Sequence, residues 1–278
     1  MLPPPADPAP EFPVAPLPTS ADCAADTAGG LTFDLADPGL PGAAHLRLHR
    51  RESGQEVRLP LTPAGDGRLR AVLPSSVALP EGRWDVYAEQ ADGSSERLVP
   101  GLNDLRALVD RAPGEARDHV AVRIPYATKH GNLTVRAWHR APHAEAGELC
   151  IEEAALTVRG RVYGAALTAG AYAEARSRKE AGLARRAELT AEGAEFAFTV
   201  DYAALAAQGG TWDLWLRPAG EQGPEVRVAR LLDDVVDKKP IFTYPAAVLV
   251  GQDGPVQAGP YYTMDNDLSV QIAEVPEA

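Results

Sequence analysis

The chain of 278 residues is long enough for two ordinary domains, each with a hydrophobic core of its own. A formal net charge of −12, with no dense stripe of Lys and Arg, argues against nucleic acid and anionic membranes as partners, because phosphate binding depends on those cations. No apolar run approaches the length of a membrane span, and two cysteines are too few for a disulfide scaffold, so we expect a cytoplasmic protein without membrane insertion.

The N-terminal segment, residues 1–25, contains eight prolines and few large apolar side chains. It lacks the basic and apolar stretches of a secretory signal. Such a composition cannot bury enough apolar surface to form a core, so we predict an extended or disordered Pro-rich tail.

Beyond the tail the sequence repeats itself. The stretch EGRWDVYAEQ around Trp84 returns as GGTWDLWLRP around Trp212, 128 positions later, and LTPAG returns as LTAEG at the same spacing. Further along, YATKHGNLTV returns as YYTMDNDLSV, 135 positions later. Because the recurring stretches keep their order and nearly their spacing, we predict two copies of one domain, residues 26–139 and 145–278.

Within each copy, apolar and polar residues alternate with a period of two, which is typical of strands with one face in a core and one in water. Leu133, Val135 and Ala137 are predicted to face the core, while the residues between them face outward. Turn signals rich in Gly separate the short runs. The pattern predicts an all-β chain with two tandem immunoglobulin-like β-sandwich domains of antiparallel strands.

Two segments depart from simple alternation. Residues 200–210 predict one or two helical turns that end at glycine. Residues 175–189 have a helix-forming composition, but their counterpart in the first copy has the pattern of strands. We therefore predict a hairpin there, because tertiary context overrides local propensity.

The second copy contains an acidic triplet, Asp265-Asn266-Asp267, of a kind that can hold a divalent metal through carboxylate oxygens. The first copy has the letters HGN at the matching positions. Gly, Asn and Asp tolerate the positive φ that a tight hairpin requires. We therefore predict a hairpin tip, expect no metal or other cofactor, and keep Asp265 and Asp267 as the metal candidates.

Aromatic residues recur at matching positions. Trp84 and Trp212 share the register of the apolar residues and are predicted to face the cores. Tyr87 and Trp215 occupy the opposite face of the same strands, where an exposed ring can stack on the C–H face of a sugar. Trp138 also faces outward by the alternation, but it lies beside the domain junction, so packing between the domains is the favoured use.

Two motifs carry a family resemblance. The stretch IPYATKHGNLTVRAW contains a Tyr-x-Thr-x-x-Gly-Asn-Leu core, and EGRWDVYAEQ contains a Gly-x-Trp-Asp strand. Both resemble accessory β-sandwich regions that follow the catalytic domains of bacterial, notably actinobacterial, glycosyltransferases and polyol-phosphate transferases, which build teichoic-acid-like wall polymers. The core maps onto Tyr126, Thr128, Gly131, Asn132 and Leu133, and in the second copy onto Tyr261, Thr263 and Leu268.

The second copy departs from this motif. Asn266 and Asp267 stand where the motif has Gly and Asn, which weakens the case for one ligand at both tips. The alternating strands and helices of the family's nucleotide-sugar-binding catalytic domain are absent from the sequence. The resemblance therefore implies an accessory, targeting or oligomerising module that meets a wall polymer or its transferase.

The sequence contains no nucleophile–base motif and no zinc-ligand spacing, so no catalytic residue is predicted. Our leading hypothesis is a non-catalytic accessory or scaffold protein that binds a protein partner, a wall glycan or a glycosyltransferase, or that forms a homo-oligomer. The alternative is a glycan-related enzyme, a transferase or hydrolase, that uses Asp265 and Asp267. The candidate glycan-binding or partner-binding residues are Tyr87, Trp138, Trp215, Tyr126, Thr128, Asn132, Tyr261 and Thr263.

Overall fold

The structure of the protein is a computed structural model that describes residues 18–36, 42–109, 111, 113, 118–251 and 254–275. The described residues are nearly all β, as the alternating pattern predicts, and their helices are one turn, α1 (Ala203–Ala206), and the two short 3-10 turns η1 and η2. None of these helices has the length and apolar character needed to cross a membrane.

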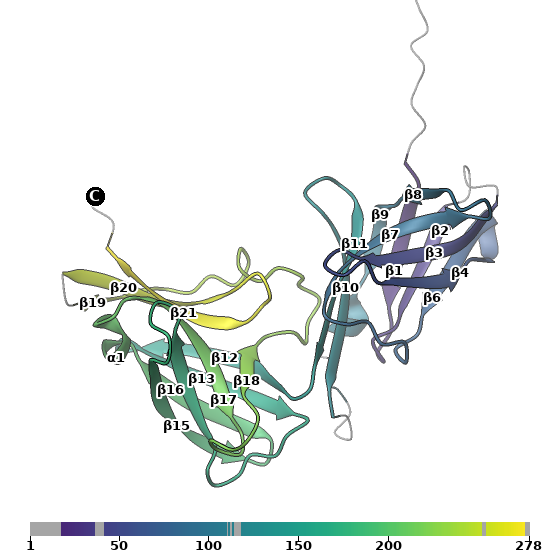
Figure 1. Cartoon of the computed structure of the whole chain (residues 1–278). Helices are drawn as coiled ribbons and strands as arrows, with labels where there is room; N and C mark the ends of the chain where they lie inside the picture. The colour runs from purple at the N-terminus through teal and green to yellow at the C-terminus, as the bar shows by residue number, and fades with distance from the viewer. Residues whose placement is uncertain are drawn as a thin grey trace, which may run out of the picture.

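Two sheets enclose a core in the N-terminal part of the chain (Figure 1). One has the strand order β5-β6-β2-β1-β9 and the other β10-β11-β7-β3-β4, with β8 beside β7. Phe33, Leu46 and Trp84 come from both sheets and are fully buried between them. The elements are β1 (Ser20–Ala25), β2 (Leu31–Ala36), β3 (Ala43–Arg50), β4 (Glu56–Pro60), β5 (Thr62–Pro63), η1 (Gly65–Gly67), β6 (Arg68–Leu73), β7 (Gly82–Gln90), β8 (Ser95–Arg97), β9 (Val99–Asp104), η2 (Arg106–Leu108), β10 (Val120–Ala127) and β11 (Leu133–Arg140).

The C-terminal part has a separate core. Seven of its strands close into a ring in the order β14-β15-β16-β13-β12-β18-β17, because β17 pairs with β14. The remaining strands continue from β17 as β21-β20-β19 (Figure 1). The strands are β12 (His143–Glu152), β13 (Ala155–Tyr163), β14 (Tyr172–Ser177), β15 (Ala184–Glu192), β16 (Glu195–Asp201), β17 (Gly210–Arg217), β18 (Val226–Ala229), β19 (Ala247–Val250), β20 (Pro255–Tyr262) and β21 (Leu268–Glu274).

The sequence repeat is also a repeat of strand register. Trp84 of β7 pairs with Val135 of β11, and Trp212 of β17 pairs with Val270 of β21. Both tryptophans are 0% exposed, so the prediction that they face the cores is confirmed. Since their neighbours occupy equivalent places, each position in one part can be compared with its counterpart in the other.

Local predictions can be checked against the described residues. The hairpin predicted over residues 175–189 is confirmed, because β14 pairs antiparallel with β15. The helical turn predicted within residues 200–210 is also confirmed, as α1. The predicted tail overlaps a strand: residues 1–17 lie outside the described part, but β1 starts at Ser20, since alternate side chains such as Ala21 and Cys23 are buried in the core.

A third apolar cluster joins the two parts. Val122, Ile124 and Trp138 extend from the outward face of β10 and β11, and they pack with Ala229 and Leu231 of the C-terminal part. Each of these five side chains is at most 1% exposed. The surface that alternation assigns to water on β10 and β11 is therefore covered by the other half of the chain.

Candidate functional site

The acidic triplet is the tip of the β20–β21 hairpin, as predicted. The Thr263 backbone N–H donates to the Asp267 carbonyl at 2.8 Å, and the Thr263 hydroxyl oxygen accepts from the Asp265 and Asp267 backbone N–H groups at 3.3 and 3.2 Å. Asn266 takes the left-handed conformation, with φ 61°. The residue types therefore satisfy the needs of a tight turn.

The hairpin tip of the N-terminal part, between β10 and β11, has the same internal geometry. The Thr128 backbone N–H donates to the Asn132 carbonyl at 2.9 Å, and the Thr128 hydroxyl oxygen accepts from the His130 and Asn132 backbone N–H groups. Gly131 supplies the positive φ, 77°. Thr128, Thr263 and Asn132 thus have a structural task in these turns, whether or not they also meet a ligand.

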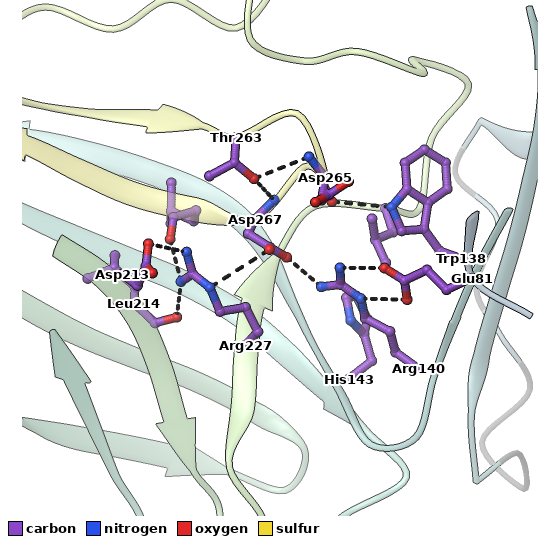
Figure 2. A network of polar contacts seen from close by, with 12 residues as sticks. Glu81, Trp138, Arg140, His143, Asp213, Leu214, Arg227, Thr263, Asp265 and Asp267 are labelled. Carbon is purple, nitrogen blue, oxygen red and sulfur yellow. Dashed lines mark hydrogen bonds and ion pairs between the residues drawn. The ribbon is translucent and has the colours of Figure 1, made fainter. Parts of the chain in front are cut away.

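The tip of the C-terminal part docks on β11 of the N-terminal part (Figure 2). Trp138 Nε1 donates to the Asp265 backbone carbonyl at 3.2 Å. Arg136 Nη2, not labelled in the figure, donates to Asp265 Oδ1 at 2.7 Å. Arg140 Nη1 donates to Asp267 Oδ1 at 2.6 Å. Because these three β11 residues alternate along the strand, they form one outward-facing row, and we call their contacts with the tip the junction contacts.

Arg140 is the central charge of the junction. Its guanidinium also donates to both carboxylate oxygens of Glu81, at 3.0 and 3.3 Å, so two carboxylates share one half-buried cation (Figure 2). Burial works against the charged form, but Asp267 and Glu81 more than offset it, and the pKa of Arg140 is raised above its usual value. The junction therefore holds this cation firmly in its charged state.

Asn266 connects the tip to the loop that follows β18. Its side chain is fully buried; Nδ2 donates to the Val236 carbonyl and Oδ1 accepts from the Lys238 backbone N–H, each at 3.2 Å. The Lys238 ammonium is itself buried and lies 2.7 Å from Asp233 Oδ1. Burial lowers the pKa of Lys238, although Asp233 opposes the shift. Every residue of the triplet is thus engaged by the protein.

This arrangement bears on the metal candidates. Asp265 and Asp267 each pair with a guanidinium group. Throughout the described residues, no three His, Cys, Asp or Glu side chains gather in a way that could hold a metal ion. The chemistry that the tip offers here is ion pairing between two halves of one chain.

The predicted sugar-stacking aromatics, Tyr87 and Trp215, are half-buried under arginines. The guanidinium carbons of Arg47 and Arg97 lie 4.7 and 4.9 Å from the Tyr87 ring centroid. The guanidinium carbons of Arg176 and Arg227 lie 4.6 and 5.4 Å from the Trp215 ring centroid. Cation–π contacts within the protein therefore already use both rings.

An aspartate anchors the arginine in each copy. Asp85 accepts from Arg97 Nη2 at 2.6 Å, and Asp213 accepts from Arg227 Nη2 at 2.6 Å. Burial raises the pKa of each carboxyl, but hydrogen bonds and nearby guanidinium charges outweigh it, so both pKa values lie below the usual 3.8. The repeat therefore conserves this polar network between its two copies as well as their strands.

These lowered pKa values predict an acid-sensitive fold. A carboxyl with a depressed folded-state pKa contributes stability above its unfolded value, and this contribution is lost as pH falls through the folded value. We expect the free energy of unfolding, measured in urea, to drop below about pH 4, and Asp213→Asn to flatten that dependence while weakening the fold at pH 7. The exposed Glu192→Gln should leave the profile unchanged; a flat wild-type profile between pH 5 and about 2 would contradict the expectation.

The remaining aromatic candidates divide between the two repeats. Tyr126 and Tyr261 are half-buried at equivalent places on β10 and β20. Trp138, 1% exposed, is closed to any outside ligand in this arrangement and serves the packing between the parts that its position favoured. The structure therefore brings Trp138 to the C-terminal tip. Tyr87 and Tyr126 share the outward face of one sheet in the first repeat, and Trp215 and Tyr261 share the equivalent face of the second.

Sequence reasoning did not single out Arg136 and Arg140, the residues that receive the acidic tip. A signal was available: the first copy has Arg, Trp and Arg at alternating positions 136, 138 and 140, where the second copy has Gln, Ala and Val. The replacement of three large side chains on the outward face of one strand by Gln, Ala and Val indicates that only one of the two faces is covered.

Comparisons with known proteins place no family on the chain. No family model and no curated protein matches it. Among solved structures, a fragment of S. aureus TarS (residues 217–571) is 14% identical, with 66% of this chain and 55% of that chain covered and a TM-score of 0.34. The chain thus spans about half of that fragment.

Two further solved structures are similar at lower scores. A type I pullulanase from Bacillus subtilis complexed with maltose is 11% identical, covering 84% of this chain and 29% of that chain, with a TM-score of 0.25. A tetra-tandem repeat from the extending region of a large adhesion protein is 10% identical, covering 92% and 66%, with a TM-score of 0.24. Likenesses this distant carry no argument about function.

Proposed function

We propose that this chain is a non-catalytic accessory or scaffold protein made of two tandem immunoglobulin-like β-sandwiches. It mediates interaction with a protein or a glycan, in the setting of cell-wall polymer biosynthesis. The observation that carries the proposal is the docking of the second repeat's acidic tip on the first repeat's β11. The second repeat uses its hairpin tip to hold the first repeat in a fixed position, which is the role expected of a scaffold.

The junction supports a scaffold in physical terms. An apolar cluster and several charge-assisted hydrogen bonds hold the two repeats together, so their outer surfaces keep a set spacing and orientation. Scaffolds and targeting modules benefit from this rigidity, because ordering a flexible joint on binding costs conformational entropy and weakens affinity. No observation favours the alternative of a glycan-related enzyme, since Asp265 and Asp267 are both paired with arginines.

A ligand screen tests the proposal. A ligand that binds only the folded chain stabilises it by about 2.7 kcal/mol at 100 times its dissociation constant, which raises the melting temperature. We expect wall glycans to raise the melting temperature, or light scattering to reveal a complex with a protein partner. We expect no rise in the melting temperature with nucleotide sugars plus Mn²⁺ or Ca²⁺. A shift with Mn²⁺ and a nucleotide sugar that Asp265→Ala removes would overturn the proposal in favour of a transferase.

A further inference from the structure

The outward face of β20 and β21 carries a hollow of about 320 Å³. This volume is near the lower limit, roughly 300 Å³, of pockets that hold small ligands. The polar side chains at its wall come from two neighbouring strands and from the loop before β19. Residues that line the hollow include Lys239, Gln257, Gly259, Tyr261, Gln271 and Ala273.

The hollow exists because bulky residues of the first copy are small in the second. In β10 and β11, Val122 pairs with Trp138 and Ile124 pairs with Arg136. At the equivalent places of β20 and β21, Gln257 pairs with Ala273 and Gly259 pairs with Gln271. Ile124 and Trp138, which seal the junction in the first copy, are therefore replaced by Gly and Ala, and space that they would fill stays open.

Ile124 and Trp138 lie on the outward face of β10 and β11, the counterpart of the face with the hollow. Both are 1% exposed and pack against the C-terminal part. The equivalent face of β20 and β21 instead presents two side-chain amides and a phenol. An apolar side chain of a protein partner would remove water from these groups without forming hydrogen bonds to them, which is costly. The chemistry of the two faces has diverged from protein packing toward polar binding.

The polar groups are arranged for a hydroxyl-rich ligand. Gln271 is held in place, because its Oε1 accepts from Thr211 Oγ1 at 2.7 Å and its Nε2 donates to the Ile272 carbonyl at 3.2 Å. A primary amide has two donor hydrogens and two acceptor lone pairs, so each end of Gln271 retains capacity for a ligand. Tyr261 adds a half-buried ring to the same wall, with the Lys239 ammonium 5.5 Å from its centroid.

We propose that this hollow binds one sugar ring of a glycan, an inference that rests on the proposed function and names its site. The C–H face of the ring packs on Tyr261 and its hydroxyls pair with Gln257 and Gln271. Lys239 favours a sugar with an acidic substituent over a neutral one. Amides suit hydroxyls because both groups donate and accept.

A second copy of this chain is a weaker occupant. The tip that would dock there by analogy is the first repeat's, which carries Lys129 and His130 and has no carboxylate. The docked tip of the second repeat is held by Arg136 and Arg140 through its two aspartates. Lys129 facing Lys239 offers no such complementarity, so head-to-tail assembly through this face is disfavoured.

Saturation-transfer NMR on the full chain tests the proposal. The probes are the methyl glycosides of glucose, N-acetylglucosamine and glucuronic acid, each at millimolar concentration, because a single sugar ring binds weakly. Gly259→Ile restores the residue of the first copy and places a side chain in the hollow; its Cβ would make an ordinary contact with the Ala246 Cα at 3.5 Å. Tyr261→Ala removes the stacking surface, and Tyr126→Ala, at the equivalent place of the first repeat, is the matched control.

We expect the glucuronide to bind most tightly, and both Gly259→Ile and Tyr261→Ala to weaken it about tenfold or more, with Tyr126→Ala unchanged. Binding that survives Gly259→Ile with an intact melting temperature would overturn the site and leave the proposed function standing. No saturation transfer to any of the three glycosides would overturn the sugar proposal itself. Hydrolysis of a methyl glycoside in the same samples would instead overturn the non-catalytic function.

Discussion

Replacing Trp138 with alanine should reduce the free energy of unfolding by about 3–5 kcal/mol, the cost of deleting a large, fully buried aromatic side chain. Trp138 is 1% exposed between the two parts of the chain. Its indole N–H also donates to the Asp265 backbone carbonyl at 3.2 Å, and the Arg136 guanidinium lies 4.8 Å from its ring centroid. The substitution removes apolar contact, a hydrogen bond and a cation–π contact at one place.

The loss should also uncouple the two parts. Each has a core of its own, so weakening the cluster between them removes the link that makes unfolding one cooperative event. Urea unfolding followed by tryptophan fluorescence should change from one transition to two, and small-angle X-ray scattering should show a larger radius of gyration. Trp138→Phe, which keeps most of the apolar area, is the control, with a loss of about 1–2 kcal/mol.

One cooperative transition for Trp138→Ala, with less than about 1 kcal/mol lost, would contradict this account of the junction. In that outcome the two parts would be coupled by the strand connection between β11 and β12 and not by the cluster.

Asp267→Ala should cost about 2–4 kcal/mol, because it removes one of the two carboxylates that compensate the largely buried Arg140 guanidinium. The Asp267 side chain is 19% exposed and lies 2.6 Å from Arg140 Nη1, which is 15% exposed. Its second carboxylate oxygen lies 3.8 Å from Arg227, which also borders the Trp215 network. After the substitution, Arg140 would keep Glu81 as its carboxylate partner in the junction.

The repeat supplies a matched control for this substitution. Asn132 occupies the place of Asp267 in the first repeat's tip, and its backbone makes the same bonds to Thr128. Asn132→Ala should change stability by no more than about 0.5 kcal/mol. Equal losses for the two variants, measured by urea unfolding at pH 7, would show that the turn and not the junction sets the cost.

Adding salt separates the two effects further. Screening weakens exposed ion pairs more than buried ones, so the loss caused by Asp267→Ala should persist in high salt. A loss that vanishes at about 1 M salt would place the pair in solvent and contradict its burial in the junction.

The local and repeating features followed from the amino-acid sequence. Alternation with period two predicts strands, because side chains on a strand point to opposite faces whatever surrounds it. The triplet at Asp265 predicts a turn, because positive φ is a property of a few residue types and of nearest neighbours. The doubled Trp-Asp stretch predicts two equivalent strands, and Trp84 and Trp212 hold equivalent places in the fold.

The tertiary structure alone decided what covers the outward faces. Alternation states that Trp138 points away from its own core, but not whether water or another part of the chain meets it. The same holds for Tyr87 and Trp215, which arginines from neighbouring strands cover, and for the hollow at Gly259, which nothing described fills. The junction contacts join residues more than a hundred positions apart and depend on how two folded units dock. The arginine contacts depend on which strands become neighbours within one unit, and no local pattern encodes either arrangement.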